Sequence, residues 1–222
     1  MNDKINELQR INKNIIDQNG QLLSFDKQLI QLMSGVFDTR YPLVIAPNTM
    51  SLSYINDLNP NNCLVMNSST VIKLREKHDL GFEFVSNCER YLQESLLAFE
   101  SYKHETSKVI LLREVDDDGF PMVAICRQDK SVGRMIFINE ITSIYDKQNL
   151  SRLISATYEM DKMFFKNKKI EQYIRSIGLQ LPQGGTYALS DSYDKQVFNK
   201  SQVEKDIAII LSEEHEEDEM EM

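Results

Sequence analysis

Apolar residues near the start of the chain recur every three or four positions, which is the period of an amphipathic helix. One such stripe runs through residues 2–19 and ends at Asn19-Gly20, a pair that tolerates a left-handed backbone. A second covers about 25–34 and stops at the sequence GVFDTRYP. We predict a helix for each stripe. The pair, residues 2–33, either packs against the domain that follows or provides a surface for a partner or for self-association.

The stretch from residue 43 to residue 100 combines a strand pattern with helix patterns. LVIA, residues 43–46, is a short apolar run stopped by Pro47, and it predicts a strand. A helix is predicted over about 87–100, where the apolar positions have helical spacing. These anchoring positions are Tyr91, Leu92, Leu96 and Phe99.

Between this strand and this helix lies the sequence KLREKH, residues 73–78, which predicts a further helix. That helix carries several cations in an otherwise acidic chain. Ser69 or Thr70 is expected to cap its start. Val71, Leu74 and His78 follow at i, i+3 and i+7, so the histidine is predicted to share the apolar face of the helix.

The period then changes to that of strands. Three apolar segments follow one another with turn residues between them: KVILLREV (108–115), FPMVAICR (120–127) and RMIFINEI (134–141). Asp118-Gly119 marks the first turn as a tight hairpin. The segments therefore predict an antiparallel meander.

Helical patterns return at about 150–165 and 167–177, and residues 203–211 predict a short helix or strand. The order predicts an α+β fold, in which N-terminal helices precede an antiparallel meander of about three to four strands packed with helices. We expect four parts, ending in a flexible, disordered acidic tail. They are a helical arm (1–40), an α+β domain (41–182), an extension (183–211) and the tail (212–222).

Charge narrows the choice of partners. The last ten residues hold seven carboxylates, so removing them takes the net charge from −9 to −2. A nearly neutral body cannot attract phosphate through its overall charge, and a nucleic-acid site would have to be a local patch. Residues 127–175 carry ten Lys/Arg against six Asp/Glu, with the densest point at KNKK, 166–169.

Several classes of protein are not indicated. No apolar run approaches the roughly 20 residues of a membrane span, and the first residues do not resemble a secretory signal, so we expect a cytoplasmic protein in a bacterial host. Cys63, Cys88 and Cys126 are far apart and are predicted to be reduced core residues. The common nucleotide-binding, zinc-protease and hydrolase motifs do not occur in the sequence. We expect no cofactor and no metal.

Six motifs follow one another over about residues 43–182. They are a strand at LVI, a helix ending in KxxxKH, a helix ending in FES, the hairpin VILLREVDDDGFPMVAI, the strand NEITSIY and the segment GLQLP. In this order they resemble the C-terminal toxin-like domain of phage MuF head-morphogenesis proteins. That domain is grouped with the barnase, EndoU, colicin and RelE-like nucleases. The resemblance therefore implies a toxin-type domain of a phage or mobile element that cleaves RNA by metal-independent transesterification.

The chain has residues suited to that reaction, which needs a proton carrier and donors to the phosphate oxygens. His78 is the candidate acid or base, because the pKa of an unperturbed histidine lies near neutral pH. Lys77 and Lys73, on a neighbouring face of the same helix, would stabilise the phosphate. Ser143 and Tyr145 are the further candidates for catalysis.

Two more residues are candidates for substrate binding. On an alternating strand over residues 136–145, Asn139 is predicted to share one face with Ser143 and Tyr145. Ser101, at the end of FES, is the other substrate-binding candidate.

Each candidate also has a purely structural interpretation. His78 could be a hydrogen-bonded histidine on an apolar helix face, and Ser143 and Tyr145 could be ordinary sheet residues. Asp116–Asp118 could bind a divalent cation, but their position favours a solvated hairpin tip.

Two function classes therefore remain open, and whether the chain is an enzyme is uncertain. The first is an endoribonuclease, whose partner is RNA. The second is an acidic binding protein, such as an anti-defence inhibitor that presents carboxylates to a host nucleic-acid-binding or defence protein where that protein expects phosphates. A phage accessory protein is a milder form of the second class.

Overall fold

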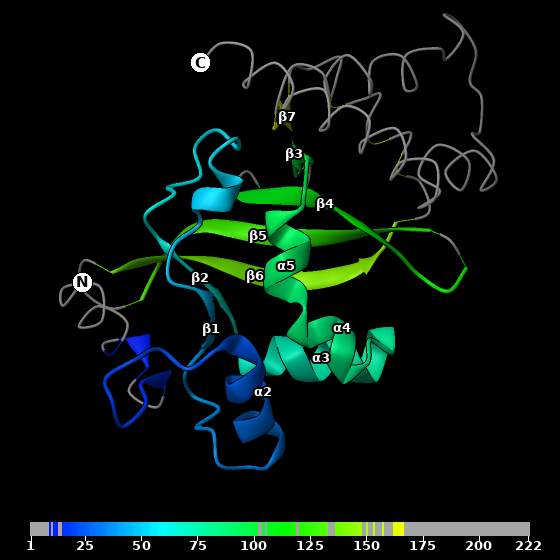
Figure 1. Ribbon diagram of the computed structural model, residues 1–222. Coiled ribbons are helices and arrows are strands. Elements are labelled where there is room, and N and C mark those ends of the chain that lie inside the picture. Colours follow the sequence, from blue (N-terminus) through cyan, green and yellow to red (C-terminus); the bar gives the residue numbers. More distant parts are fainter. Residues whose placement is uncertain are drawn as a thin grey trace, which may run out of the picture.

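The computed structural model shows a seven-stranded mixed sheet with helices against one face (Figure 1). It describes residues 9, 11–12, 15–101, 104, 106–118, 120–132, 136–147, 150, 153, 157 and 162–166. The helices are α2 (Phe25–Met33), α3 (Ser68–His78), α4 (Phe82–Ser86) and α5 (Cys88–Gln93), with a 3-10 turn η2 (Met50–Leu52). The strands are β1 (Leu43–Ala46), β2 (Cys63–Met66), β3 (Leu97–Glu100), β4 (Ser107–Val115), β5 (Pro121–Ser131), β6 (Phe137–Asp146) and β7 (Met163–Phe165).

The sheet confirms the α+β class but is larger than the predicted meander. Its order is β1-β2-β6-β5-β4-β3-β7, and the strands β3 to β6 form an antiparallel meander within it. Strand β2 pairs in parallel with β6, which makes the sheet mixed. Local turn signals reveal hairpins, whereas this pairing joins residues more than seventy positions apart, which no local pattern reports.

Two predicted helices are helical only in their first part, and a short apolar run at the end of each forms a strand instead. α5 ends at Gln93, and Leu97–Glu100 form β3 instead of continuing the helix to residue 100. Likewise Met163–Phe165 form β7, within the segment 150–165 predicted as helical. Apolar runs of three or four residues fit a buried strand as well as a helix, and here pairing with β4 decides the outcome for β3.

Of the two helices predicted at the N-terminus, one is confirmed and the other ends earlier than expected. The second helix is confirmed as α2. The first was predicted to reach Asn19, but Ile16 pairs with Leu22 in an isolated antiparallel bridge, so the chain turns before that point. The segments 167–182 and 183–222, including the predicted tail, lie outside the described residues.

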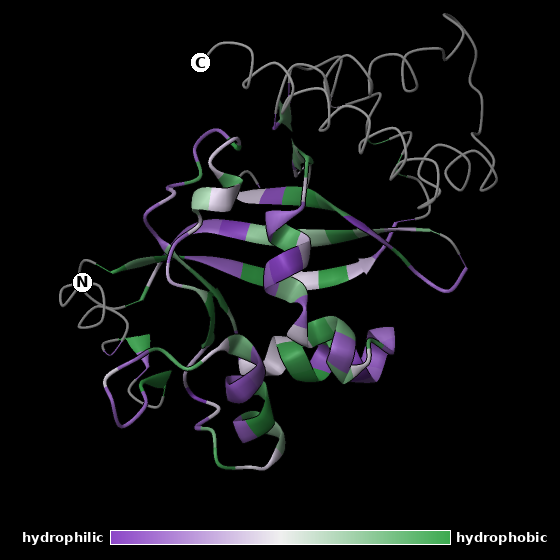
Figure 2. Ribbon diagram, in the orientation of Figure 1, coloured by the Kyte–Doolittle hydropathy of each residue, from purple (hydrophilic) through white to green (hydrophobic). Residues whose placement is uncertain are grey.

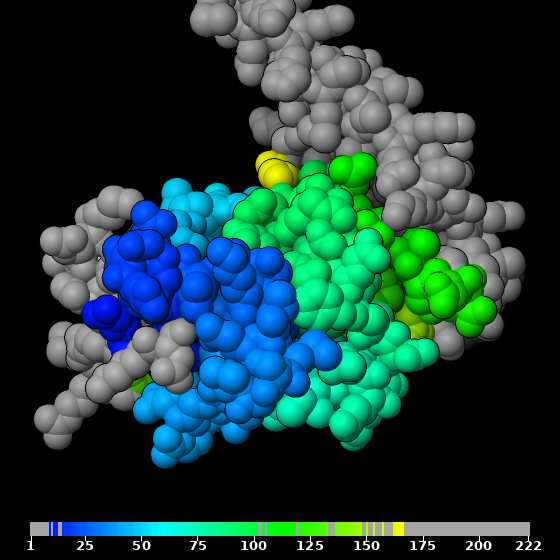
Figure 3. Space-filling model, turned by 60° about the horizontal axis from the view of Figure 1, so that its bottom comes forward, coloured from blue at the N-terminus to red at the C-terminus, as the bar shows by residue number. Residues whose placement is uncertain are grey.

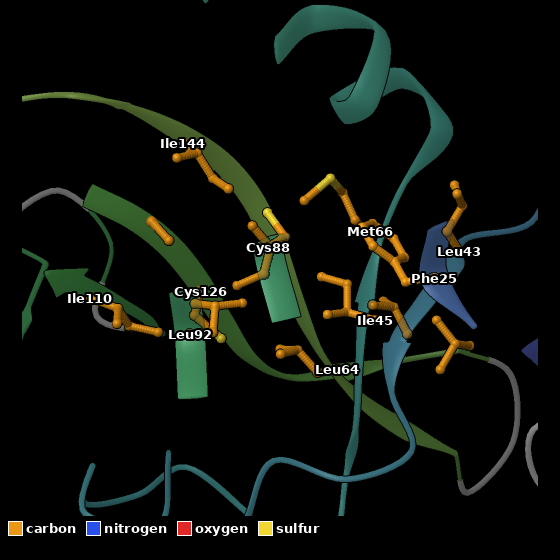
Figure 4. Close-up of a cluster of buried hydrophobic side chains, with 14 of the residues drawn as sticks. Phe25, Leu43, Ile45, Leu64, Met66, Cys88, Leu92, Ile110, Cys126 and Ile144 are labelled. Carbon is orange, nitrogen blue, oxygen red and sulfur yellow. The ribbon is translucent and has the colours of Figure 1, made fainter. Parts of the chain in front are cut away.

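The core lies chiefly between the sheet and the helices. α5 crosses the face of β4, β5 and β6 (Figure 1), and the side chains beneath it are buried together (Figure 4). Cys63, Cys88 and Cys126 are all free and buried, as predicted. β1 and β2 are hydrophobic along their whole length, whereas the tip of the β4–β5 hairpin is hydrophilic (Figure 2).

The outer edge of β1 is held by a side chain. The amide of Gln28, from the buried face of α2, accepts a hydrogen bond from the Val44 backbone N–H at 2.8 Å and donates one to the Val44 carbonyl oxygen at 3.0 Å. Gln28 has no exposed surface. Both backbone groups of an edge residue are thus paired without another strand.

A bulge in β6 sets which residues share a face. Ser143 pairs with Ile125 on β5, but the next β5 residue, Cys126, pairs with Ile141, so Thr142 is an extra residue. Ile141 and Ile144 accordingly both pack in the helix-side core, although they are three positions apart. The alternation of side chains on β6 therefore shifts by one position at residue 142.

Candidate functional site

Helix α3 carries the histidine that the sequence singled out, and both of its ends are fixed by specific contacts. The predicted caps Ser69 and Thr70 lie inside the helix, and Asn67 is the capping residue. The Asn67 side chain makes no bond to the helix; it donates to the carboxylate of Glu140 on β6. Glu140 is 3% exposed and also pairs with Lys130 at 2.7 Å. The buried Glu140 carboxylate, paired with the partly exposed Lys130, thus ties the start of α3 to the sheet.

The C-terminal end of α3 closes without glycine. Asp79 takes a left-handed backbone conformation with φ of 49°, and the Leu80 N–H bonds to the Leu74 carbonyl at 3.1 Å. The short polar side chain of an aspartate tolerates this conformation better than most residues do. The turn leaves His78 at the last helical position, above the far end of β6.

There, the His78 ring stacks on the Tyr145 ring, with 6.2 Å between their centroids and 28° between their planes. Both side chains are partly buried. They lie in the wall of a cavity of about 360 Å³ between the end of α3, α4 and the β4–β5 hairpin. The helix end that carries the candidate His78 thus lies against the strand that carries the candidate Tyr145.

The wall of the cavity is strongly acidic. Asp116, Asp117 and Asp118 come from the hairpin, Asp79 from the end of α3, and Asp146 from the end of β6. The apolar part of the wall consists of Leu80, Phe84, Val115 and Met122.

Hydrogen bonding distinguishes these carboxylates. Asp116 accepts a bond from the Phe120 N–H at 2.7 Å and so helps to close the hairpin. Asp117 and Asp118 are exposed. Burial raises the pKa of the Tyr145 hydroxyl, and the nearby charge of Asp146 raises it further. At neutral pH Tyr145 therefore keeps its proton and can donate a hydrogen bond.

The candidate lysines lie elsewhere on α3. Lys73 and Lys77 are exposed, and neither lines the cavity. Both belong to faces of the helix that turn away from the packed residues Val71 and Leu74. Among the residues that the structure describes, the cavity thus combines the histidine with carboxylates and with none of the ammonium groups that a phosphate site needs.

The predicted common face of Asn139, Ser143 and Tyr145 was wrong. The bulge at Thr142 puts Asn139 on the same face as Ile141, whereas Ser143 is on the opposite face, beside Ile125. A single inserted residue is invisible to a period-two pattern because the sequence on either side continues to alternate.

Asn139 is a structural residue in this fold. It has no exposed surface, and its amide nitrogen donates to the Thr49 hydroxyl at 2.9 Å and to the Asn59 carbonyl at 3.0 Å. Its amide oxygen accepts a bond from the Asp129 N–H at 3.2 Å. The side chain thereby joins the loop before β2 to strands β5 and β6.

Ser101 is also distant from the cavity. It follows β3, whose last residue Glu100 pairs with Lys108 at the start of β4, while the cavity lies at the other end of β4, at Val115. At about 3.3 Å per strand residue the two positions are roughly 25 Å apart.

Sequence reasoning missed the carboxylates as part of the site. Asp116–Asp118 were visible as a hairpin tip, but nothing local indicates that this tip folds back toward the end of α3. Among the residues that the structure describes, no group of three His, Cys, Asp or Glu side chains is arranged to hold a metal ion. Within the same residues, no helix has the length and apolar character needed to cross a membrane.

The fold and the cavity thus define an α+β domain with an acidic, aromatic-walled site. Residues 69–172 match the family model of the phage MuF C-terminal domain. The matched segment is a phage-associated domain, and it includes α3, the β4–β5 hairpin and β6, which supply most of the cavity. No curated protein and no solved structure matches the chain.

Proposed function

We propose that this chain is a phage-associated binding protein that acts in the bacterial cytoplasm and accepts a basic segment of a host nucleic-acid-binding or defence protein in the His78–Tyr145 cavity. The single observation that carries this proposal is the set of five aspartates in the cavity wall. A protein that binds nucleic acid contacts phosphate through basic side chains, and the carboxylates of this site could pair with the same side chains.

The geometry suits a guanidinium group in particular. Arginine can pair with carboxylates through parallel hydrogen bonds and can stack its planar head on an aromatic ring. The cavity offers exposed carboxylates on Asp117 and Asp118, and the rings of Tyr145 and Phe84. Its volume of about 360 Å³ is large enough for a long side chain.

The same wall disfavours a phosphodiester. A phosphate in the cavity would meet several like charges at short range, and each contact of that kind is repulsive by about 1 kcal/mol in water and more where water is partly excluded. Lys73 and Lys77 do not line the cavity and so cannot offset that repulsion from within it.

Binding of two labelled probes to the full chain tests the proposal. Fluorescence anisotropy with an arginine-rich peptide and with an RNA oligonucleotide should show salt-sensitive binding of the peptide and none of the RNA. Asp117→Asn/Asp118→Asn should weaken the peptide at least tenfold, which is about 1.4 kcal/mol.

The matched control is Glu213→Gln/Glu214→Gln, which removes the same charge from the C-terminal segment. This variant should bind the peptide nearly as well as the wild type. Equal weakening by both double variants would mean that the peptide responds only to the net charge of the chain, and the proposed site would then be wrong.

Endoribonuclease activity is the second candidate, favoured by the His78–Tyr145 stack, which supplies a proton carrier and a hydroxyl donor in one cavity. It keeps His78 as acid or base, but Lys73, Lys77, Asn139, Ser101 and Ser143 do not line the cavity. Expression in a bacterium, with total RNA examined on a gel, separates the candidates. Loss of RNA with the wild type but not with His78→Ala would establish the nuclease and overturn the binding proposal.

A further inference from the structure

Exposed apolar side chains gather on the helical side of the molecule, next to the cavity at the end of α3. Met33 on α2 is 47% exposed, Ile72 on α3 is 44% exposed and Phe82 on α4 is 38% exposed. Ile30 and Val36, on α2 and just after it, are more exposed still. Figure 3 shows this face, with α2 and the segment after it beside α3 and α4.

A groove of about 510 Å³ lies between these elements. Buried or partly buried Leu32, Val71 and Leu80 line it, together with the exposed Met33, Ile72 and Phe82. The same face therefore offers both an apolar hollow and apolar side chains that project beside it. Neighbouring exposed apolar residues of this kind mark interaction surfaces more often than isolated ones do.

The charges along the groove are of both signs. Arg75 and Glu76 of α3 line it, and so does Asp79, which directly follows the helix. A uniformly acidic or uniformly basic partner would meet at least one like charge there. A partner that carries the same mixed row in the reverse direction would place Arg75 opposite Glu76 in both halves of the interface.

We infer that the partner on this face is a second copy of the chain, related by a two-fold axis, with the two α3 helices antiparallel across the groove. A two-fold axis uses the same patch on both copies, so that patch must be complementary to itself. Here the projecting Phe82 and Met33 of each copy can enter the hollow of the other, while Arg75 of each copy faces the acidic residues of the other.

Sedimentation of the full chain across a range of concentrations tests this inference. The wild type should dimerise, and Ile72→Glu should raise the dissociation constant about 100-fold or more, because it buries a charge at the centre of the interface. Met50→Glu is the matched control, since Met50 on η2 is 56% exposed and does not line the groove. Circular dichroism should show an unchanged fold for both.

The direction of the pairing is tested by charge reversal. Arg75→Glu should weaken the dimer about tenfold by placing like charges together, and adding Glu76→Arg to it should restore most of the affinity. A double variant as weak as Arg75→Glu alone would overturn the antiparallel arrangement. A wild type that stays monomeric at several hundred micromolar, or equal effects of Ile72→Glu and Met50→Glu, would overturn the dimer itself.

Discussion

Strand β6 has polar side chains toward both ends. Those at one end are buried and hydrogen-bonded within the protein, whereas those at the other end line a cavity. Asn139 is buried with its amide bonded on both sides, to Thr49 and Asn59 through nitrogen and to Asp129 through oxygen. At the other end, Tyr145 is partly buried beside His78 and faces a cavity. A polar group that is buried and fully paired supports the fold, whereas one on a cavity wall is available to a ligand.

The bulge at Thr142 separates these two roles. Without it, Asn139 and Tyr145 would project from one face and could act on one substrate. With it, one part of the strand holds the loop before β2 and the other part lines the cavity. Substitutions along the strand should therefore act on stability at one end and on binding at the other.

The largest effect is expected for Asn139→Ala. It leaves the Asp129 N–H without its partner and takes one of two donors from the Asn59 carbonyl, which keeps its bond from the Thr49 hydroxyl. The loss of these partly buried bonds should lower the free energy of unfolding by about 1–3 kcal/mol. Urea unfolding followed by circular dichroism measures it. Ser143→Ala, on the same strand, serves as the control and should stay within about 0.5 kcal/mol of the wild type. Equal losses in the two variants would contradict the division of the strand.

A smaller loss of stability is expected for His78→Ala. The variant gives up one ring stack at a partly exposed site, so unfolding should change by about 0.5–1 kcal/mol. Binding of the arginine-rich peptide should nevertheless fall, because the cavity loses part of its wall. A loss of stability as large as that of Asn139→Ala would show that His78 belongs to the packed core instead.

The smallest effect concerns the pH dependence set by Tyr145, whose pKa is raised by burial and by the charge of Asp146. Above about pH 10 a tyrosine in the unfolded chain loses its proton first. The unfolded state then binds fewer protons than the folded state, so the free energy of unfolding falls as the pH rises. Tyr145→Phe should remove part of that fall.

Urea midpoints at about pH 8 and about pH 11 measure this difference. The exposed Tyr41→Phe is the matched control and should follow the wild type. If Tyr145→Phe and Tyr41→Phe lose the same stability between the two pH values, the environment of Tyr145 does not cause the fall in the free energy of unfolding.

The sequence predicted those parts of the fold that depend on local signals. α2, α3 and the β4–β5 hairpin all follow from apolar spacing and turn residues. The strand β3 was missed because LLAF fits the end of a helix as well as a buried strand. The parallel pairing of β2 with β6 was missed because it joins distant residues that no turn connects.

The sequence named His78 and Tyr145 as separate candidates. Their rings meet although the residues are 67 positions apart, and no periodicity in the sequence would have shown this contact. The five carboxylates come from three separate elements, so their charges converge only when the hairpin packs near the end of α3. That convergence turns a site expected to hold phosphate into one better suited to a cation.

The amide of Gln28 at the outer edge of β1 has a consequence for how the molecule can assemble. Because one side chain already satisfies both backbone groups of Val44, an incoming peptide cannot extend the sheet there without first expelling it. Pairing of another strand with that edge is thereby opposed by a single glutamine, and replacing it with alanine would leave both backbone groups of Val44 unpaired beneath α2.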